Sequence, residues 1–272
     1  MMRAIWALAL AGTLAACDFG GGGADPSPAP TPTPTPAASA SATATAASNG
    51  ARAVSEETDD FLFEFSYPSQ AGRIPELAAL LDGRLDRIRA RLASEAEQAR
   101  RQLRADGFPY NKHSHSSEWQ VVADLPDWLS LSEEVSTYTG GAHGNSTVRS
   151  LVWDRKAARA MDAIALFTSP AALEQALGDR FCKGLDSERG KRRGVRPAEG
   201  SDEAFDKCPG IDELEVLVGS SNGRTFNRLT LYAGPYVAGP YSEGAYEVNL
   251  DVDRAVLGAV KPEFRAAFTA RN

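Results

Sequence analysis

Residues 61–106 read FLFEFSYPSQAGRIPELAALLDGRLDRIRARLASEAEQARRQLRAD, and this stretch decides most of the fold. At its start, aromatic residues occupy every second position, which is the period of a β-strand with one strongly apolar face. From Pro75 to Asp106 the apolar residues recur at steps of three and four, which predicts a long amphipathic helix whose arginines form a solvated face. Pro75 suits the first turn of this helix, and Gly107 suits its end. The aromatic residues of the strand are Phe61, Phe63, Phe65 and Tyr67.

Outward from this stretch, the same periodicities predict the remaining elements of one domain at residues 55–272. Short turns between consecutive strands favour antiparallel pairing. The predicted fold class is therefore α+β, an antiparallel sheet with the long amphipathic helix and further helices packed on it. A chain of this length can bury a sizeable core. Strands are predicted at 118–125, 128–138, 146–153, 214–218, 226–232 and 246–252, and a second helix at 170–185.

The first residues, MMRAIWALALAGTLAAC, have the layout of a secretory signal, with one basic residue, an apolar run and small residues before Cys17. The apolar run is too short to span a bilayer core, which needs roughly 20 apolar residues. Leu14-Ala15-Ala16-Cys17 resembles the lipobox of bacterial lipoproteins, in which the cysteine receives diacylglycerol; an ordinary signal peptide with a chance cysteine is the alternative. We predict a signal peptide at 1–16 and an exported protein held in a bacterial membrane through Cys17. It would face the periplasm or the cell exterior, and the choice between inner and outer membrane stays open.

Residues 17–54 continue with glycines and then DPSPAPTPTPTPAASASATATAAS, a Gly/Pro/Ala/Thr-rich composition that cannot form a core. Proline at alternate positions favours an extended chain, which gives a reach on the order of 50 Å. We therefore predict a disordered tether between the lipid and the domain. The formal net charge of the whole chain is −7, which argues against nucleic acid as a partner.

Two further cysteines, Cys182 and Cys208, would lie in an oxidising compartment after export. They are predicted to form a disulfide, which would stabilise the fold by roughly 3 to 4 kcal/mol in the chain-entropy model. Between them lies a basic cluster set among glycines, which predicts a solvated, mobile loop; contact with anionic lipid is the alternative. The cluster consists of Arg189, Lys191, Arg192, Arg193 and Arg196.

Residues 138–143 read YTGGAH and form the most distinctive motif. Gly140, Gly141 and Gly144 around His143 predict a tight connection between two strands. The first interpretation of His143 is an imidazole that is hydrogen-bonded to nearby backbone, and ligand contact is the second. General-base catalysis would need a nucleophile or carboxylate oriented against it, and no motif marks one. Replacement of His143 by Ala is expected to lower stability without abolishing any activity of the domain.

This turn is followed by a strand that ends in Trp153-Asp154, by Met161-Asp162, by Leu166-Phe167, and later by YVAGPYSEG at 236–244. The series resembles an envelope module found in the extracellular part of the RsiV anti-sigma factor and ahead of the catalytic domain of the PdaC peptidoglycan deacetylase. The resemblance spans most of 61–260, and it departs from the family around 189–209 and at 232–235. It implies an extracellular module that recognises lysozyme in the RsiV family and is accessory in the deacetylase. The Asp and His-x₃₋₄-His set of such deacetylases has no counterpart in this chain.

Other side chains complete the set of candidates. His113 and His115, in NKHSHSSEW, would join His143 in a zinc site, but the polar, Ser-rich surroundings predict a solvated loop instead. Tyr236 and Tyr241 predict either core and turn or an exposed shelf for a sugar or a partner loop. The candidate ligand-binding residues are Tyr138, Gly140, Gly141, His143, Tyr236 and Tyr241, and no catalytic residue, metal or cofactor is assigned.

These observations leave three functions open. The preferred one is a membrane-anchored envelope lipoprotein whose domain is not an enzyme and binds a lysozyme-like protein or a peptidoglycan fragment. The second is a cell-wall hydrolase or deacetylase-related enzyme that uses His143. The third is a structural spacer of the envelope.

Overall fold

The structure is a computed structural model that describes residues 41–46, 48–198, 200, 201 and 203–271. The predicted signal peptide, Cys17 and the tether up to residue 40 lie outside the described residues. Within the range 17–54, however, strand β1 (Ser41–Ala46) pairs with strand β2 (Arg52–Glu57), so regular structure begins before residue 55. None of the described helices has both the length and the apolar character needed to cross a bilayer.

The main sheet has seven strands in the order β1-β2-β3-β4-β5-β6-β7. The predicted antiparallel pairing is confirmed between neighbours in this sheet, except that β3 and β4 run parallel. The parallel pair follows from the connection between them, because the long helix α2 returns the chain to the same end of the sheet. The strands after β2 are β3 (Phe61–Tyr67), β4 (His113–Asp124), β5 (Trp128–Tyr138), β6 (Asn145–Asp154) and β7 (Arg159–Met161).

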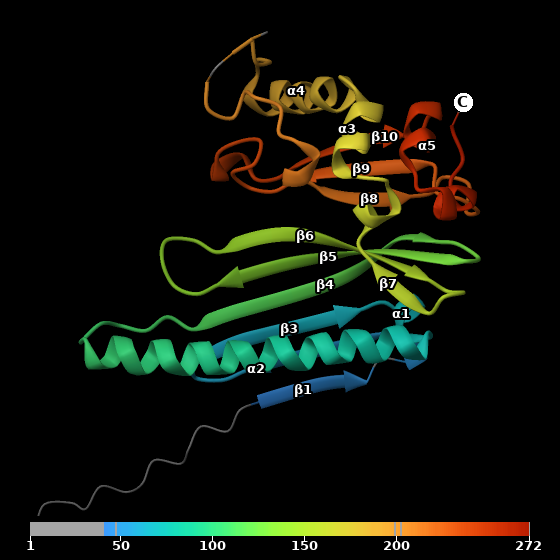
Figure 1. The fold of residues 1–272 in the computed structure, drawn as a ribbon. Coiled ribbons are helices and arrows are strands. Elements are labelled where there is room, and N and C mark those ends of the chain that lie inside the picture. The colour runs from blue at the N-terminus through green and yellow to red at the C-terminus, as the bar shows by residue number, and fades with distance from the viewer. Residues whose placement is uncertain (1–40, 47, 199, 202, 272) are drawn as a thin grey trace, which may run out of the picture. The chain divides into compact units, whose positions relative to one another are not determined.

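Helix α2 (Pro75–Ala105) covers one face of this sheet (Figure 1). It begins at Pro75, whose missing N–H lies where a helix has no acceptor for it. Its leucines pack on the aromatic face of β3, as the alternating sequence predicted, and on tryptophans of β4 and β6. The buried members of this core include Phe61, Phe63, Phe65, Tyr67, Leu77, Leu81, Leu85, Leu92, Trp119, Leu131, Leu151 and Trp153.

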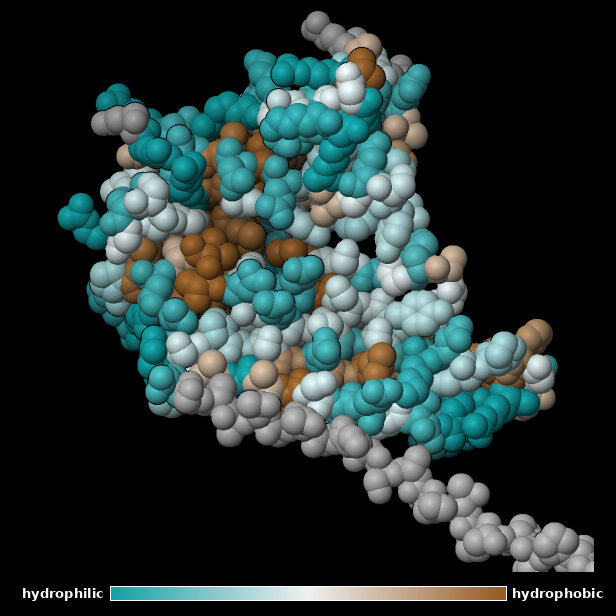
Figure 2. All heavy atoms as spheres, turned by 180° about the vertical axis from the view of Figure 1, so that it is seen from behind, coloured by the Kyte–Doolittle hydropathy of each residue, from teal (hydrophilic) through white to brown (hydrophobic). Residues whose placement is uncertain are grey.

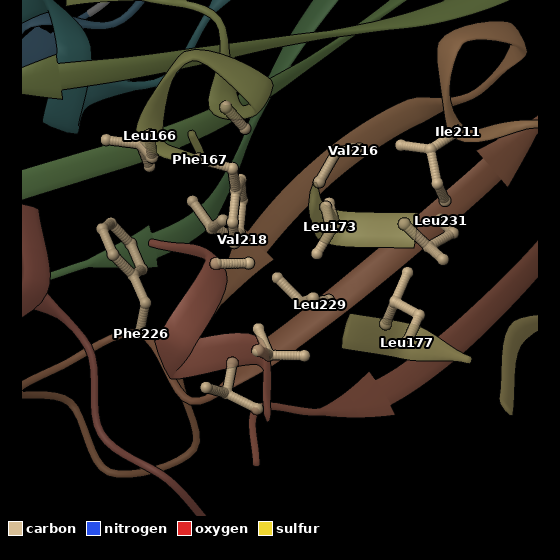
Figure 3. Close-up of a cluster of buried hydrophobic side chains, with 14 of the residues drawn as sticks. Leu166, Phe167, Leu173, Leu177, Ile211, Val216, Val218, Phe226, Leu229 and Leu231 are labelled. Carbon is tan, nitrogen blue, oxygen red and sulfur yellow. The ribbon is translucent and has the colours of Figure 1, made fainter. Parts of the chain in front are cut away.

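The other side of the main sheet is covered by a second sheet with strand order β10-β9-β8, which the sequence did not predict as a separate layer. Strand β8 packs against β4, β5 and β6, and helix α4 packs against β10 (Figure 1). Leu173 and Leu177 of α3 lie beside Leu229 and Leu231 of β9 in the core of this part (Figure 3). These strands are β8 (Glu215–Gly219), β9 (Arg228–Ala233) and β10 (Tyr246–Asp251).

The predicted helix at 170–185 is in fact two helices, α3 (Pro170–Leu177) and α4 (Arg180–Arg193). Gly178 separates them with a φ of 53°, a left-handed conformation that glycine adopts without strain. The remaining helical segments are short. They are α1 (Ser69–Gly72), α5 (Arg254–Ala259), η1 (Ser48–Gly50), η2 (Ala163–Leu166), η3 (Ile211–Glu213), η4 (Tyr241–Glu243) and η5 (Pro262–Ala267).

Apolar surface is not spread evenly over the molecule. On the face opposite to that of Figure 1, it gathers in the region between the C-terminal sheet and the seven-stranded sheet, with hydrophilic side chains around it (Figure 2). Exposed apolar patches of this kind often mark binding surfaces.

Candidate functional site

The YTGGAH turn connects β5 to β6 and is built on glycine. Gly140 and Gly141 have φ values of 99° and 93°, a region that other residues enter only with strain. Gly144 is needed for a different reason, since a Cβ there would lie 2.7 Å from the carbonyl oxygen of Thr137. The hydroxyl of Tyr138 donates to the Gly141 carbonyl at 3.0 Å, which closes the turn.

His143 at the tip of this turn meets two tyrosines from a segment about a hundred residues later. Its ring stacks on Tyr241 with centroids 3.9 Å apart, and the Tyr236 and Tyr241 rings are 5.6 Å apart. The Tyr241 hydroxyl donates to the Gly144 carbonyl at 2.8 Å. We call His143, Tyr236 and Tyr241 the aromatic cluster; the structure brings these three candidates together, with Tyr138, Gly140 and Gly141 in the supporting turn.

The hydrogen bonds of His143 define its tautomer. Nδ1 lies 2.9 Å from the Gly144 carbonyl oxygen, which only accepts, so Nδ1 carries the proton in the neutral ring. Nε2 then faces the Tyr236 hydroxyl at 3.5 Å. Within the described part of the chain, no carboxylate, serine or cysteine is hydrogen-bonded to this ring. The backbone-bonded imidazole is therefore confirmed, and the ring also belongs to an exposed aromatic surface.

Tyr236 is exposed, with 53% of its surface accessible. Its φ is 70°, a left-handed conformation that disfavours a tyrosine by roughly 1–2 kcal/mol. The conformation is held by the hydrogen bonds of a tight turn, from the Tyr236 N–H to the Gly239 carbonyl and from the Val237 N–H to the Gly234 carbonyl, both at 3.1 Å. The fold therefore presents this ring to solvent at the expense of local strain.

The basic cluster supports the aromatic segment. The prediction of a mobile loop is wrong for Arg189, Lys191, Arg192 and Arg193, which all lie in helix α4. Arg189 is 0% exposed and lies in α4, where its guanidinium donates to the carbonyls of Ala238, Asp206 and Lys207 at 2.9–3.0 Å. These carbonyls, together with the Asp186 carboxylate 3.0 Å from Nη1, satisfy the buried guanidinium. The Cys182–Cys208 disulfide, which confirms the predicted pairing, closes this stretch with a Cα separation of 5.5 Å.

Arg193 holds the same segment through a two-pronged contact with Glu243. Its Nε donates to Glu243 Oε1 at 3.0 Å, and its Nη2 donates to Oε2 at 3.0 Å. Burial alone would raise the pKa of Glu243, but the hydrogen bonds from Arg193 and Tyr246 lower that pKa below its usual range. Arg192 adds a bond to the Glu243 carbonyl and places its guanidinium 4.1 Å from the Tyr246 ring centroid. Helix α4 thus fixes the segment that carries Tyr236 and Tyr241.

His113 and His115 lie in strand β4, so the predicted solvated loop is wrong. His113 is buried, and His115 Nε2 lies 2.9 Å from Ser117 Oγ. Nowhere among the described residues do three His, Cys, Asp or Glu side chains gather closely enough to hold a metal ion. The sequence did carry a strand signal at 113–119, where every second residue lies on one face. In the structure, these side chains lie on the same side of the sheet as the aromatic residues of β3.

Sequence reasoning also missed Glu133. It is 2% exposed, and it lies opposite Arg149 in the β5–β6 pair. Burial raises its pKa, and the hydrogen bond from Ser117 and the charges of Arg149 and Arg84 oppose that rise. Burial, with a smaller effect of Arg149, lowers the pKa of His115. The sequence could have predicted this burial, because Glu133 alternates with Leu129, Leu131 and Val135 on the apolar face of β5.

Comparison with known proteins supports the resemblance drawn from the YTGGAH turn. Residues 54–146 match the family model of Deacetylase PdaC. The PdaC match runs from β2 through β5 to the glycine turn, and it leaves the segment of Tyr236 and Tyr241 outside. No curated protein matches the chain.

Two solved structures are similar to this chain. One is a DUF3298 family protein from Pseudomonas aeruginosa PAO1, with 16% identity, 86% of this chain and 95% of that chain covered, and a TM-score of 0.45. The other is a DUF3298 family member from Bacteroides fragilis NCTC 9343, with 13% sequence identity and a TM-score of 0.44. That match covers 79% of this chain and 91% of the other.

Proposed function

We propose that this PdaC-type domain is a non-catalytic binding module of the cell envelope whose aromatic cluster contacts a wall-associated ligand. The ligand would be a lysozyme-like protein or a peptidoglycan fragment. The observation that carries the proposal is the exposed, strained Tyr236 held beside His143 and Tyr241. Aromatic rings with an apolar face and a polar edge are favoured at protein interfaces, and the same face suits a sugar ring.

The enzymatic alternative has less support. A general base must be oriented by a partner and must reach a nucleophile or a water. His143 is instead stacked on Tyr241, and its Nδ1 is engaged by the Gly144 carbonyl. The spacer alternative does not account for the strain at Tyr236, because a spacer needs no exposed ring there. Export and lipid anchoring through Cys17 complete the proposal and rest on the sequence of residues 1–17 alone.

The proposal is tested by calorimetric titration of residues 41–272, a range that keeps β1 and β2, with lysozyme and with a muropeptide digest. One of the two is expected to bind, with an affinity that falls only modestly between low and physiological salt. Salt screens the long-range attraction of an acidic protein for a cationic partner, but it weakens the short-range contacts of a shape-complementary interface much less. No heat with either ligand would contradict the proposal. Binding that vanishes at physiological salt, or that an unrelated acidic protein matches, would do the same.

Tyr236→Gly sharpens the test because it separates binding from folding. Glycine adopts the φ of 70° without strain, so the variant is expected to keep or raise its free energy of unfolding while its affinity falls about tenfold or more. Ala158→Gly is the matched control, since Ala158 also has a positive φ, of 48°, but lies in the β6–β7 turn away from the cluster. Unchanged affinity in Tyr236→Gly would show that the aromatic cluster is not the contact.

A further inference from the structure

A cleft of about 920 Å³ lies beside the uncovered edge of β6. Strand β7 pairs only with Val152, Trp153 and Asp154, so the outer edge of the first part of β6 has no strand partner in the described structure. Helix α2 forms one wall of the cleft, and the segments around η2, η3 and β8 form the other. The aromatic cluster is not part of its lining.

The α2 wall carries unpaired positive charge. Arg84, Arg87 and Arg91 follow one another at steps of three and four, so they share one helix face, and Arg149 of β6 joins them in the lining. No ion pair involves any of these four arginines within the described residues, although Arg84 lies over the Trp119 ring with its guanidinium carbon 5.3 Å from the ring centroid. Elsewhere on α2, by contrast, Arg89, Arg100 and Arg101 pair with Glu56, Asp60 and Glu97.

The opposite wall carries carboxylates. Asp162 and Asp212 line it, and their side chains have no hydrogen-bond partner in the part of the chain that the structure describes. Glu215 lies between them and the sheet, where its Oε1 accepts from the Ser150 N–H at 2.7 Å, a donor on the open edge of β6. The cleft is therefore lined by charges of both signs. Four guanidinium groups lie on α2 and β6, with the exposed carboxylate of Glu95 beside them on α2, and three carboxylates lie on the opposite wall.

The floor of the cleft contains an unsatisfied buried acceptor. Glu133 is 2% exposed, and its Oε1 has no hydrogen-bond partner among the described residues. A buried polar atom without a partner is uncommon in a folded protein, and it calls for an explanation such as a bound group that completes it. Apolar side chains of Ile88, Val135 and Ile164 also line the cleft.

We propose that this cleft binds a short dipolar peptide, with its carboxylates on the arginines of α2 and β6 and its ammonium group on Asp162 and Asp212. Guanidinium forks match carboxylates in geometry, and none of the four arginines forms an ion pair within the described residues. The carboxylate wall excludes a purely anionic ligand by repulsion and selects one that also carries an amine. The site is separate from the aromatic cluster, so it holds whether or not the proposed envelope function does.

The test uses the full chain and the tripeptide Ala-Glu-Lys with free termini, titrated by calorimetry. Three probe forms separate the two walls: the free peptide, the peptide with both amines acetylated, and the peptide with all carboxylates amidated. The free peptide is expected to bind, and each blocked form to bind about tenfold more weakly, because either block removes one set of charge-assisted hydrogen bonds.

Substitutions of cleft residues test whether the peptide binds in the cleft. Arg91→Gln, Arg149→Gln and Asp212→Asn are each expected to weaken binding of the free peptide about tenfold. Arg101→Gln is the matched control on the same helix, because Arg101 is exposed and paired with Glu97 outside the cleft, and it is expected to leave affinity unchanged. Thermal unfolding of each variant checks that the fold is retained.

Three results would overturn the proposal. The first is that the free peptide shows no binding at millimolar concentration. The second is that the acetylated peptide binds as well as the free one. The third is that Arg101→Gln weakens binding as much as Arg91→Gln does. Tyr236→Gly separates this site from the aromatic cluster, because it is expected to leave peptide binding unchanged while it weakens binding of the wall ligand about tenfold or more.

Discussion

At the scale of single residues, the informative positions are those that break a local rule. Glu133 places a carboxyl group on the apolar face of β5, and Tyr236 places a tyrosine in a conformation suited to glycine. Both lower the stability of the folded state, and both lie at surfaces proposed to bind ligands. Such conflicts persist where the surrounding structure overrides them, which is why they are reasonable starting points for functional hypotheses.

The raised pKa of Glu133 predicts how stability depends on pH. Its carboxyl group has an ordinary pKa near 4.3 in the unfolded chain and a higher one in the fold, where Arg84, Arg149 and Ser117 act on it and Trp119 lies opposite it in β4. Above about pH 4.3 the native state therefore binds more protons than the unfolded state, so this residue lowers stability as pH rises through the folded pKa. Glu133→Gln is expected to raise the free energy of unfolding at pH 7, and the gain should disappear toward pH 4.

Urea unfolding between pH 4 and pH 7 measures this effect. Glu134→Gln is the matched control, because its side chain is one position along β5 and exposed. His115, with its lowered pKa, acts in the opposite direction and destabilises the fold as pH falls below about 6.5, in the wild type and in the variant alike. A Glu133→Gln variant that is no more stable than the wild type at pH 7 would show that the buried carboxylate does not destabilise the fold.

At the scale of elements, α4 shows how one helix connects the disulfide to the aromatic cluster. Cys182 stands in its first turn, and Arg189 and Arg193 reach from its later turns to the segment around Ala238 and Glu243. Polar composition predicted a loop because a run of arginines among glycines is normally solvated. The buried Arg189 donates to three carbonyl oxygens, of residues 206, 207 and 238, and to the carboxylate of Asp186.

Arg189→Lys is predicted to lower the free energy of unfolding by about 3 kcal/mol, although the charge is retained. A lysine has no planar fork of donors, so it leaves buried carbonyls unpaired. Urea denaturation measures the loss, and hydrogen exchange at the amides of 236–239 should accelerate because the Ala238 carbonyl is released. Lys191→Ala, at an exposed position of α4, should change stability by less than about 0.5 kcal/mol. Equal stability of Arg189→Lys and the wild type would contradict the assigned role.

At the scale of the whole described domain, two hydrophobic cores share one sheet. The α2 core and the C-terminal core lie on opposite faces of strands β4, β5 and β6, so neither can lose its packing without exposing these strands. We predict a single cooperative unfolding transition. Leu77→Ala in the first core and Leu231→Ala in the second should each lower stability by about 2–5 kcal/mol and keep the transition single.

Tryptophan positions make this prediction measurable. Trp119 and Trp153 report on the α2 core, whereas Trp128 packs against Phe226 and Phe264 in the other one. Tryptophan-to-phenylalanine replacements that leave one reporter at a time should give coincident denaturation curves. Two separated transitions would show that the cores fold independently.

The sequence by itself determined the elements whose pattern is local. The aromatic alternation at 61–67, the leucine spacing of α2, the bounds of β5 at 128–138, and the pairing of Cys182 with Cys208 were all predicted and are present. The resemblance to the PdaC module was also readable from the YTGGAH turn and is matched over 54–146. These features were accessible because periodicity, turn chemistry and cysteine number are properties of neighbouring residues or of composition.

Only the tertiary structure decided the rest. It stacked a second sheet on the main one, paired β3 with β4 in parallel, buried Arg189, and brought His143 against Tyr236 and Tyr241. The charged cleft beside β6 likewise joins side chains from α2, β6 and the segments before β8. Each of these depends on contacts between residues far apart in the chain, and local pattern carries no information about which distant group will supply a carbonyl, a ring or a charge.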